Sequence, residues 1–146
     1  MSKGNTFEND LLLLVFNNTG ASLIGDATGL RGSTTAGSLY VSLHTADPGE
    51  AGTQSTSEIS YTGYARVAVA RSGAGWTVSA NSVSPVAAIT FGAMTAGAGG
   101  TVTHFAVGTD SSGTGKLLYS GTVSPNIVVS TGVTPQLTTA SAITED

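Results

Sequence analysis

The chain contains no cysteine among its 146 residues, and only 10% of its residues are charged. Without cysteine it cannot form disulfides, thiolate zinc sites or a cysteine nucleophile. Its five Lys and Arg residues stand singly and are outnumbered by nine Asp and Glu, so it lacks the basic stripe that neutralises phosphates in nucleic-acid-binding proteins. Its one long apolar run, Leu11 to Phe16, is far shorter than the about 20 residues of a membrane span. We therefore expect neither a nucleic-acid partner nor a membrane partner.

The shortage of charge also bears on the surface, because about a quarter of the residues in an average globular chain are charged. Here Ser, Thr, Gly and apolar groups must cover much of the exterior. Free monomers usually depend on charge for solubility, so this composition predicts that partner subunits cover part of the surface, as in a homo-oligomer, either a dimer or a trimer. The alternative is a Thr-rich β surface that is soluble without much charge.

The N-terminal residues 1–37 are predicted to form one helix followed by an arm. Asn5 can cap a helix that runs to Phe16, with Glu8 and Asp10 in its first turns. Apolar side chains surround most of this helix, so we expect it to be buried on more than one side, either within its own domain or between subunits. The candidate interface residues are Phe7, Leu11, Leu12, Leu13, Leu14, Val15 and Phe16. The glycine-rich segment that follows is either an arm that reaches a neighbouring subunit or a surface loop.

Residues 38–146 show the two-residue period of β-strands and are predicted to form one β domain. Leu39, Val41 and Leu43 share one face of a strand. Trp76, Val78 and Ala80 share a face of another. About eight strands without intervening helices predict an all-β fold, a jelly-roll-like two-sheet antiparallel sandwich with one N-terminal α-helix. The expected strands are 38–45, 63–71, 75–82, 87–91, 101–109, 116–123, 127–130 and 134–144.

Few residues suggest chemistry. His44 with Asp47 and Glu50 is the nearest approach to a metal or acid–base cluster, but the spacing is loose and contains a proline turn, which favours a strand-end histidine beside a solvated turn. His104 could approach His44 only through the fold. No nucleophile elbow, P-loop or dinucleotide-binding glycine motif lies at a strand-to-helix junction. We therefore predict a protein that is not an enzyme, with no catalytic residue, cofactor or metal.

Three aromatic side chains offer a second kind of site. Tyr61, Tyr64 and Trp76 could form a platform on which a sugar stacks. The alternative is structural, with Trp76 anchoring the core and the tyrosines at strand edges, since large aromatic side chains dominate the cores of sandwiches.

Most of the chain resembles a known family in the order and spacing of its motifs. The matching segments are NTFENDLLLLVFN, SLYVSLHTADPGEAG, YTGYARVAVARS, GWTVSANSVSP, THFAVGT, GKLLYSG and TPQLTTASAITED. They are similar to small tailed-phage virion proteins that are often labelled tail-fibre proteins and that include jelly-roll capsid cement, or decoration, proteins. These motifs consist of strand and turn residues and contain no catalytic signature.

The resemblance implies a structural protein of the virion, assembled in the host cytoplasm. We expect a capsid cement protein on the outer capsid surface that binds the lattice of the major capsid protein and stabilises the head by adhesive contacts. The alternative is a tail-fibre or lectin-like receptor-binding protein, which would use a pocket lined by Tyr61, Tyr64 or Trp76.

Overall fold

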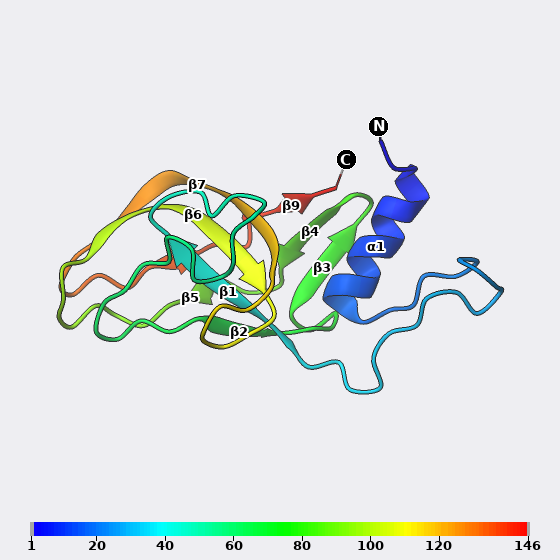
Figure 1. Ribbon diagram of the computed structural model, residues 1–146, viewed down its shortest axis with the longest axis horizontal. Coiled ribbons are helices and arrows are strands. Elements are labelled where there is room, and N and C mark those ends of the chain that lie inside the picture. The colour runs from blue at the N-terminus through cyan, green and yellow to red at the C-terminus, as the bar shows by residue number, and fades with distance from the viewer. Residues whose placement is uncertain (1, 146) are drawn as a thin grey trace. The chain divides into compact units, whose positions relative to one another are not determined.

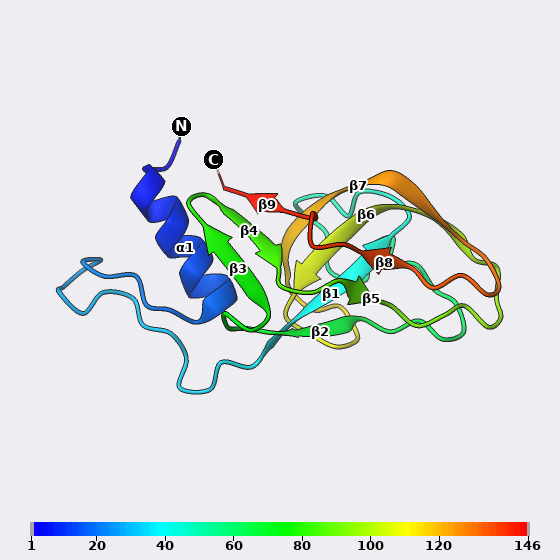
Figure 2. The same cartoon turned by 180° about the vertical axis from the view of Figure 1, so that it is seen from behind.

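A computed structural model describes residues 2–145 and confirms the predicted fold class, an all-β, sandwich-like fold with an N-terminal helix (Figures 1 and 2). The strands form three sheets rather than two, in the orders β2-β1-β6-β7, β3-β4-β9 and β5-β8. The elements are α1 (Asn5–Asn17), β1 (Ser38–His44), β2 (Val67–Ala70), β3 (Trp76–Ser79), β4 (Ser82–Pro85), β5 (Ile89–Thr90), β6 (Gly100–Gly108), β7 (Leu117–Val129), β8 (Gln136–Leu137) and β9 (Ile143–Thr144).

The chain folds into two compact units. The first, here called the helix unit, contains the residues up to Ser38, Val69–Ala88 and the residues from Thr138 onward. The second, the sheet unit, contains Leu39–Ala68 and Ile89–Leu137. β3, β4 and β9 thus belong to the same unit as α1. The predicted division into an arm, 1–37, and a sandwich domain, 38–146, concerns independent folding and stays a prediction.

In the helix unit, α1 packs beside the hairpin of β3 and β4, as both ribbon views show. A two-residue turn, Ala80–Asn81, joins these strands. Ala80 has a positive φ of 52° and lies in this turn, so its predicted place on the strand face of Trp76 and Val78 is wrong. The amide of Asn9 donates a hydrogen bond of 2.9 Å to the carbonyl of Ala80, which fixes the helix to the turn. Leu12 and Phe16 are fully buried. The apolar side of α1 therefore supplies the core of its own unit.

The ends of α1 are held differently from the expectation. Gly4, not Asn5, is the N-cap residue, and its extended backbone provides no side-chain cap, so the predicted Asn5 cap is wrong. At the other end Asn18 adopts the left-handed conformation, with a φ of 57°. Arg71 donates hydrogen bonds to the carbonyls of Leu14 and Val15 in the last turn, which satisfies backbone groups that a helix end leaves free.

In the sheet unit, β1 is a central strand with both faces covered. Leu39, Val41 and Leu43 are buried on one face, as predicted, and Ser42 and His44 are buried on the other. The segment 45–58 covers this second face, where the Thr56 carbonyl meets the His44 ring. Its end pairs with β1 through an antiparallel bridge between His44 and Glu58 and a hydrogen bond of 2.9 Å from the Ile59 amide to the Leu43 carbonyl. A polar interior therefore lies beside the apolar one.

The long strand β7 forms one edge of the four-stranded sheet and continues past Pro125, where two separate strands were expected. Its register against β6 changes between the pairs Val102↔Ile127 and His104↔Thr122. Proline has no N–H to donate, so strands accept it at an edge or an irregularity. Both conditions hold here, because the residue lies on an edge strand and within the register change.

Candidate functional site

The buried polar interior of the sheet unit centres on His44. Its Nε2 lies 2.8 Å from the Ser42 hydroxyl and its Nδ1 lies 2.8 Å from the Thr56 carbonyl. The carbonyl can only accept, so Nδ1 carries the proton of the neutral ring and Nε2 accepts from Ser42. Burial lowers the pKa of His44, because the interior disfavours the charged ring, although the hydrogen bond to Thr56 opposes this shift.

This arrangement separates His44 from its sequence neighbours Asp47 and Glu50, which are both exposed. The fold instead places His104 directly opposite His44 in the β1–β6 pairing. Within residues 2–145, no three His, Asp or Glu side chains are placed to hold a metal ion. His44 is thus a hydrogen-bonded interior residue at the end of a strand.

Beside it lies an ion pair that the sequence did not predict. Arg66 donates from Nε and Nη2 to the two carboxylate oxygens of Glu58, at 2.8 and 2.7 Å. Tyr64 donates from its hydroxyl to Glu58 and accepts from the Leu43 amide. Burial raises the pKa of Tyr64, so it remains a protonated donor. The pair with Glu58 raises the pKa of Arg66, despite the opposing effect of burial.

The same arginine organises an exposed loop, 110–115. Its guanidinium donates to the carbonyls of Asp110 and Gly113, at 2.9 and 2.6 Å. The fully buried Gln54 accepts from the Asp110 amide and donates to the Tyr40 carbonyl. A hollow of about 310 Å³ lies between this loop and the ion pair, lined by Ser55, Glu58, Tyr64, Ala65, Arg66, Ser111, Ser112 and Gly113. Because the charged groups that line it are bonded to each other or to the backbone, they serve to position the loop.

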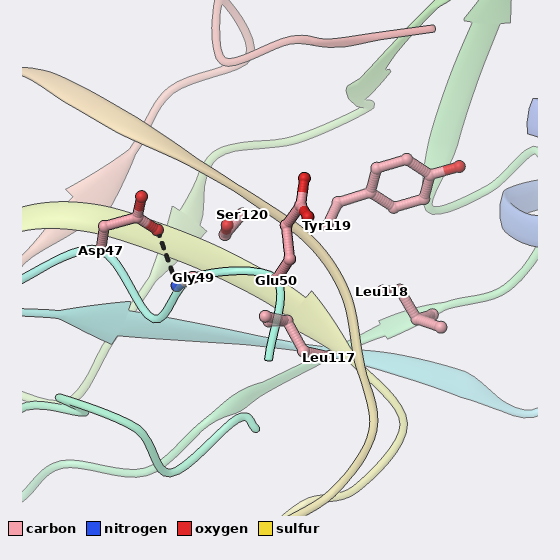
Figure 3. Close-up of a pocket in the computed structure, with 7 residues that line it drawn as sticks. All are labelled: Asp47, Gly49, Glu50, Leu117, Leu118, Tyr119 and Ser120. Carbon is pink, nitrogen blue, oxygen red and sulfur yellow. Dashed lines mark hydrogen bonds between the residues drawn. The ribbon is translucent and has the colours of Figure 1, made fainter. Parts of the chain in front are cut away.

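A second hollow, of about 380 Å³, lies against β7 in the same unit (Figure 3). One wall is the turn 47–50, in which the Asp47 carboxylate accepts a hydrogen bond of 2.9 Å from the Gly49 amide. The other wall is the start of β7. We call this feature the β7 hollow. Its lining residues are Asp47, Gly49, Glu50, Leu117, Leu118, Tyr119 and Ser120. It combines apolar side chains with two carboxylates.

The three aromatic candidates are divided between the two units. Trp76 is 2% exposed and packs edge-to-face on Phe16 in the helix unit, with 4.9 Å between ring centroids. In the sheet unit, Tyr61 is buried, lies 5.3 Å from the Tyr64 ring and donates its hydroxyl to the Gly92 carbonyl. Tyr64 also stacks on Phe91 and lines the smaller hollow. A sugar platform on these residues stays a prediction, and the burial of Tyr61 and Trp76 weighs against it.

The candidate interface residues of α1 differ in exposure. Leu12 and Phe16 lie in the core of the helix unit, whereas Phe7 is 42% exposed. The remaining four are half-buried: Leu11, Leu13, Leu14 and Val15. Binding through this helix stays a prediction, and Phe7 is its most accessible apolar side chain. Among residues 2–145, no helix combines the length and apolar character needed to cross a membrane.

Other large apolar side chains are exposed in the segment that follows α1. They are Leu23, Ile24 and Leu30. This segment projects away from α1 and the β3–β4 hairpin in Figures 1 and 2. Sequence patterns predicted an arm or a surface loop here but did not propose these side chains as interface residues.

Comparison with known families identifies the protein class. The model of the family described as podophage GP4 fiber I protein gp80 matches residues 4–144. The chain belongs to this family. A comparison with curated proteins found no match. Membership makes the chain a structural protein of a bacteriophage virion, built on a β-rich fold, which agrees with the resemblance seen in its motifs.

Proposed function

We propose that the protein is a non-enzymatic subunit of a phage tail fibre that acts by adhesive contacts with other virion proteins. The observation that carries this proposal is the match to a family described as a fibre protein, over residues 4–144. It favours the fibre assignment over capsid cement, which we expected first from the sequence motifs.

The distribution of chemical groups supports an adhesive role. The groups with catalytic potential, His44, Glu58 and Arg66, hydrogen-bond within the protein and stabilise strands and loops. In contrast, exposed apolar side chains occur on α1 and on the segment after it. Exposed apolar groups that lie near one another are typical of protein–protein contacts. The available surface therefore suits binding to protein rather than chemistry.

A second candidate function is capsid cement, in which the protein would lie on the outer capsid surface and bind the lattice of the major capsid protein. The observation that favours it is the exposed apolar arm, because an arm can span the joint between neighbouring subunits. Many weak contacts under symmetry would then stabilise the head against internal pressure.

In both functions we propose a homo-oligomer, either a dimer or a trimer, and neither nucleic acid nor membrane as a partner. The net charge of −4, with only five basic residues, gives little scope for electrostatic attachment. We therefore expect that moderate salt alone does not release the protein from particles. Release by salt without denaturant or heat would contradict an adhesive, apolar mode of attachment.

Gold-labelled antibodies against this protein test the location directly on intact particles by electron microscopy. Labels on the tail are expected for a fibre subunit, and labels spread over the head would identify the cement function instead. Particles that lack the gene product serve as the control for antibody specificity. Absence of label from both parts of intact particles, with label on denatured ones, would place the protein inside the particle and refute both functions.

A further inference from the structure

The segment after α1 is a closed loop whose ends are fastened together. Asn18 donates from its amide to the Ser33 carbonyl at 2.8 Å and accepts from the Ser33 amide at 2.6 Å. Farther out, Ala21 and Leu30 exchange two backbone hydrogen bonds of 2.8 Å. Gly29 has a φ of 59° and lies against the Ala21 carbonyl, where a Cβ would not fit. We call residues 19–32 the arm loop, a compact loop of the Ω type.

The tip of the arm loop places an apolar side chain where neither solvent nor backbone favours it. Leu23 is 80% exposed, and its φ of 64° lies in the left-handed region that side chains other than Asn, Asp and Gly rarely adopt. Ile24 beside it is also exposed. Strained, exposed residues that persist in a fold often serve function, so this tip is a candidate contact point.

Of the two charged side chains in the arm loop, Asp26 and Arg31, only Arg31 is free to meet a partner. The Asp26 carboxylate turns back onto its own loop and accepts hydrogen bonds from the amides of Thr28 and Gly29 and from the Thr28 hydroxyl. Arg31 is exposed, and its side chain forms no hydrogen bond or ion pair with any other described residue. The arm loop therefore offers a partner one cation and three exposed aliphatic side chains, of which Leu23 and Ile24 lie at the tip.

The β7 hollow of the sheet unit has the complementary composition. Its volume of about 380 Å³ falls within the range of ligand pockets, about 300–1,000 Å³. Leu117 and Leu118 both line it, with Leu117 on the side of β7 that faces the turn and Leu118 on the other side (Figure 3). The exposed Asp47 and Glu50 supply negative charge on the turn. The chain thus carries both halves of a possible contact.

We propose that the arm loop of one copy docks into the β7 hollow of a second copy, with Leu23 and Ile24 against the β7 wall and Arg31 facing Asp47 and Glu50. This inference rests on the proposed role as a virion structural subunit and names its partner as the same chain. Such a contact joins two different surfaces. When two copies exchange it reciprocally it closes a two-fold dimer, and when it runs from copy to copy in one direction it generates a ring or an open filament. A ring accounts for a closed trimer, and a filament suits a fibre.

The small size of the contact determines its strength. Two aliphatic side chains and one cation cover far less than the about 800 Å² per partner of a stable soluble complex. Association in dilute solution is therefore weak, and it becomes strong where other virion contacts hold copies side by side at high effective concentration. The chain should associate in a concentration-dependent way when it is free.

The first test removes the apolar tip without disturbing the fold. In Leu23→Asn the new side chain tolerates the left-handed backbone better than leucine, so thermal stability is expected to be unchanged or higher. Sedimentation velocity over a concentration series should show that self-association is lost. The matched control is Val128→Asn, because Val128 is 67% exposed on β7 but does not line the hollow. Equal association by wild type and Leu23→Asn, or a wild-type monomer at every concentration, would overturn the proposal.

The second test uses charge reversal at both halves of the contact. Arg31→Glu and Glu50→Arg should each associate less than wild type, because each places like charges together. When the two variants are mixed, each contact between unlike variants places opposite charges at positions 31 and 50, so association should return in the mixture alone. If the mixture associates no better than its components, the docking geometry is wrong.

Gold labelling of particles keeps this proposal separate from the proposed function. Labels on the tail combined with association that does not depend on Leu23 would refute the docking contact and leave the fibre function standing. Association that depends on Leu23, with no label on intact particles, would support the contact and refute the function.

Discussion

Phe16→Ala is the substitution with the clearest expected effect on folding. The Phe16 side chain is fully buried in the helix unit, and its ring contacts Trp76 edge-to-face at 4.9 Å. Alanine at this position leaves a cavity between α1 and β3. Since a helix end and a hairpin strand enclose the site, we expect only partial collapse of the cavity.

The cost follows from known core truncations. Replacing a buried phenylalanine by alanine costs about 3–5 kcal/mol, and this includes an aromatic contact of about 0.5–1.5 kcal/mol. Small proteins are stable by only about 5–15 kcal/mol, so the loss is a large fraction of the total. At about 2–4 °C per kcal/mol for a chain of this size, the melting temperature should fall by roughly 6–20 °C.

The chain provides its own reporter for this experiment. Trp76 is its one tryptophan and is buried beside Phe16, so fluorescence follows the helix unit, while far-ultraviolet circular dichroism follows the whole chain. The matched control is Phe7→Ala on the same helix. The Phe7 side chain is 42% exposed, so the free energy of unfolding should fall by less than about 1 kcal/mol. Equal losses for the two variants in urea titrations would refute the packing described for α1.

Three further predictions follow from the interior of the two units. A truncated chain that begins at Gly37 should be insoluble, or molten by circular dichroism, because it lacks the α1 side chains that fill the helix unit. A cooperative unfolding transition at the wild-type midpoint would contradict this. Burial lowers the pKa of His44 below 6.5, so its contribution to the free energy of unfolding is complete above that pH and falls as the pH drops. In urea titrations at several pH values, the free energy of unfolding of His44→Gln should therefore decline less below about pH 6.5 than that of the wild type. Equal declines in the two proteins would disprove the assignment. Arg66→Lys keeps the charge but cannot bridge Glu58 and the two loop carbonyls. It should lower the free energy of unfolding by about 1.5–3 kcal/mol and speed amide hydrogen exchange in loop 110–115. Unchanged exchange would show that the arginine does not hold this loop.

Local patterns in the sequence predicted the elements that depend on local physics. The helix was expected from Asn5 to Phe16 and ends one residue later, and the alternation of Leu39, Val41 and Leu43 identified the buried face of β1. The turn between β3 and β4 was missed because Ala80–Asn81 lacks the Asn-Gly or Asp-Gly signal of two-residue hairpins. β7 was divided at Pro125 because a proline normally ends a central strand, and its edge position was not evident from the chain alone.

The polar interior could not be predicted because its partners meet only through the fold. Arg66 bonds with Glu58, eight residues away, and with loop carbonyls more than forty residues away. The segment 45–58 must first cross the face of β1 before His44 becomes buried. Sequence spacing favoured a strand-end histidine beside a solvated acidic turn over a cluster of the two. The structure shows His44 at the end of β1 and assigns the turn to the wall of a surface hollow.

The position of Leu23 shows how composition and conformation together indicate attachment. Glycine or asparagine would relieve the left-handed backbone at the tip, and a polar side chain would suit its exposure. Leucine satisfies neither requirement, so nothing within the helix unit accounts for it. The proposed assembly would bury apolar surface, which suits a protein with only 10% charged residues. A strained apolar tip on a loop closed by Asn18 and Ser33 is already ordered before binding, so less conformational entropy is lost when it meets a partner.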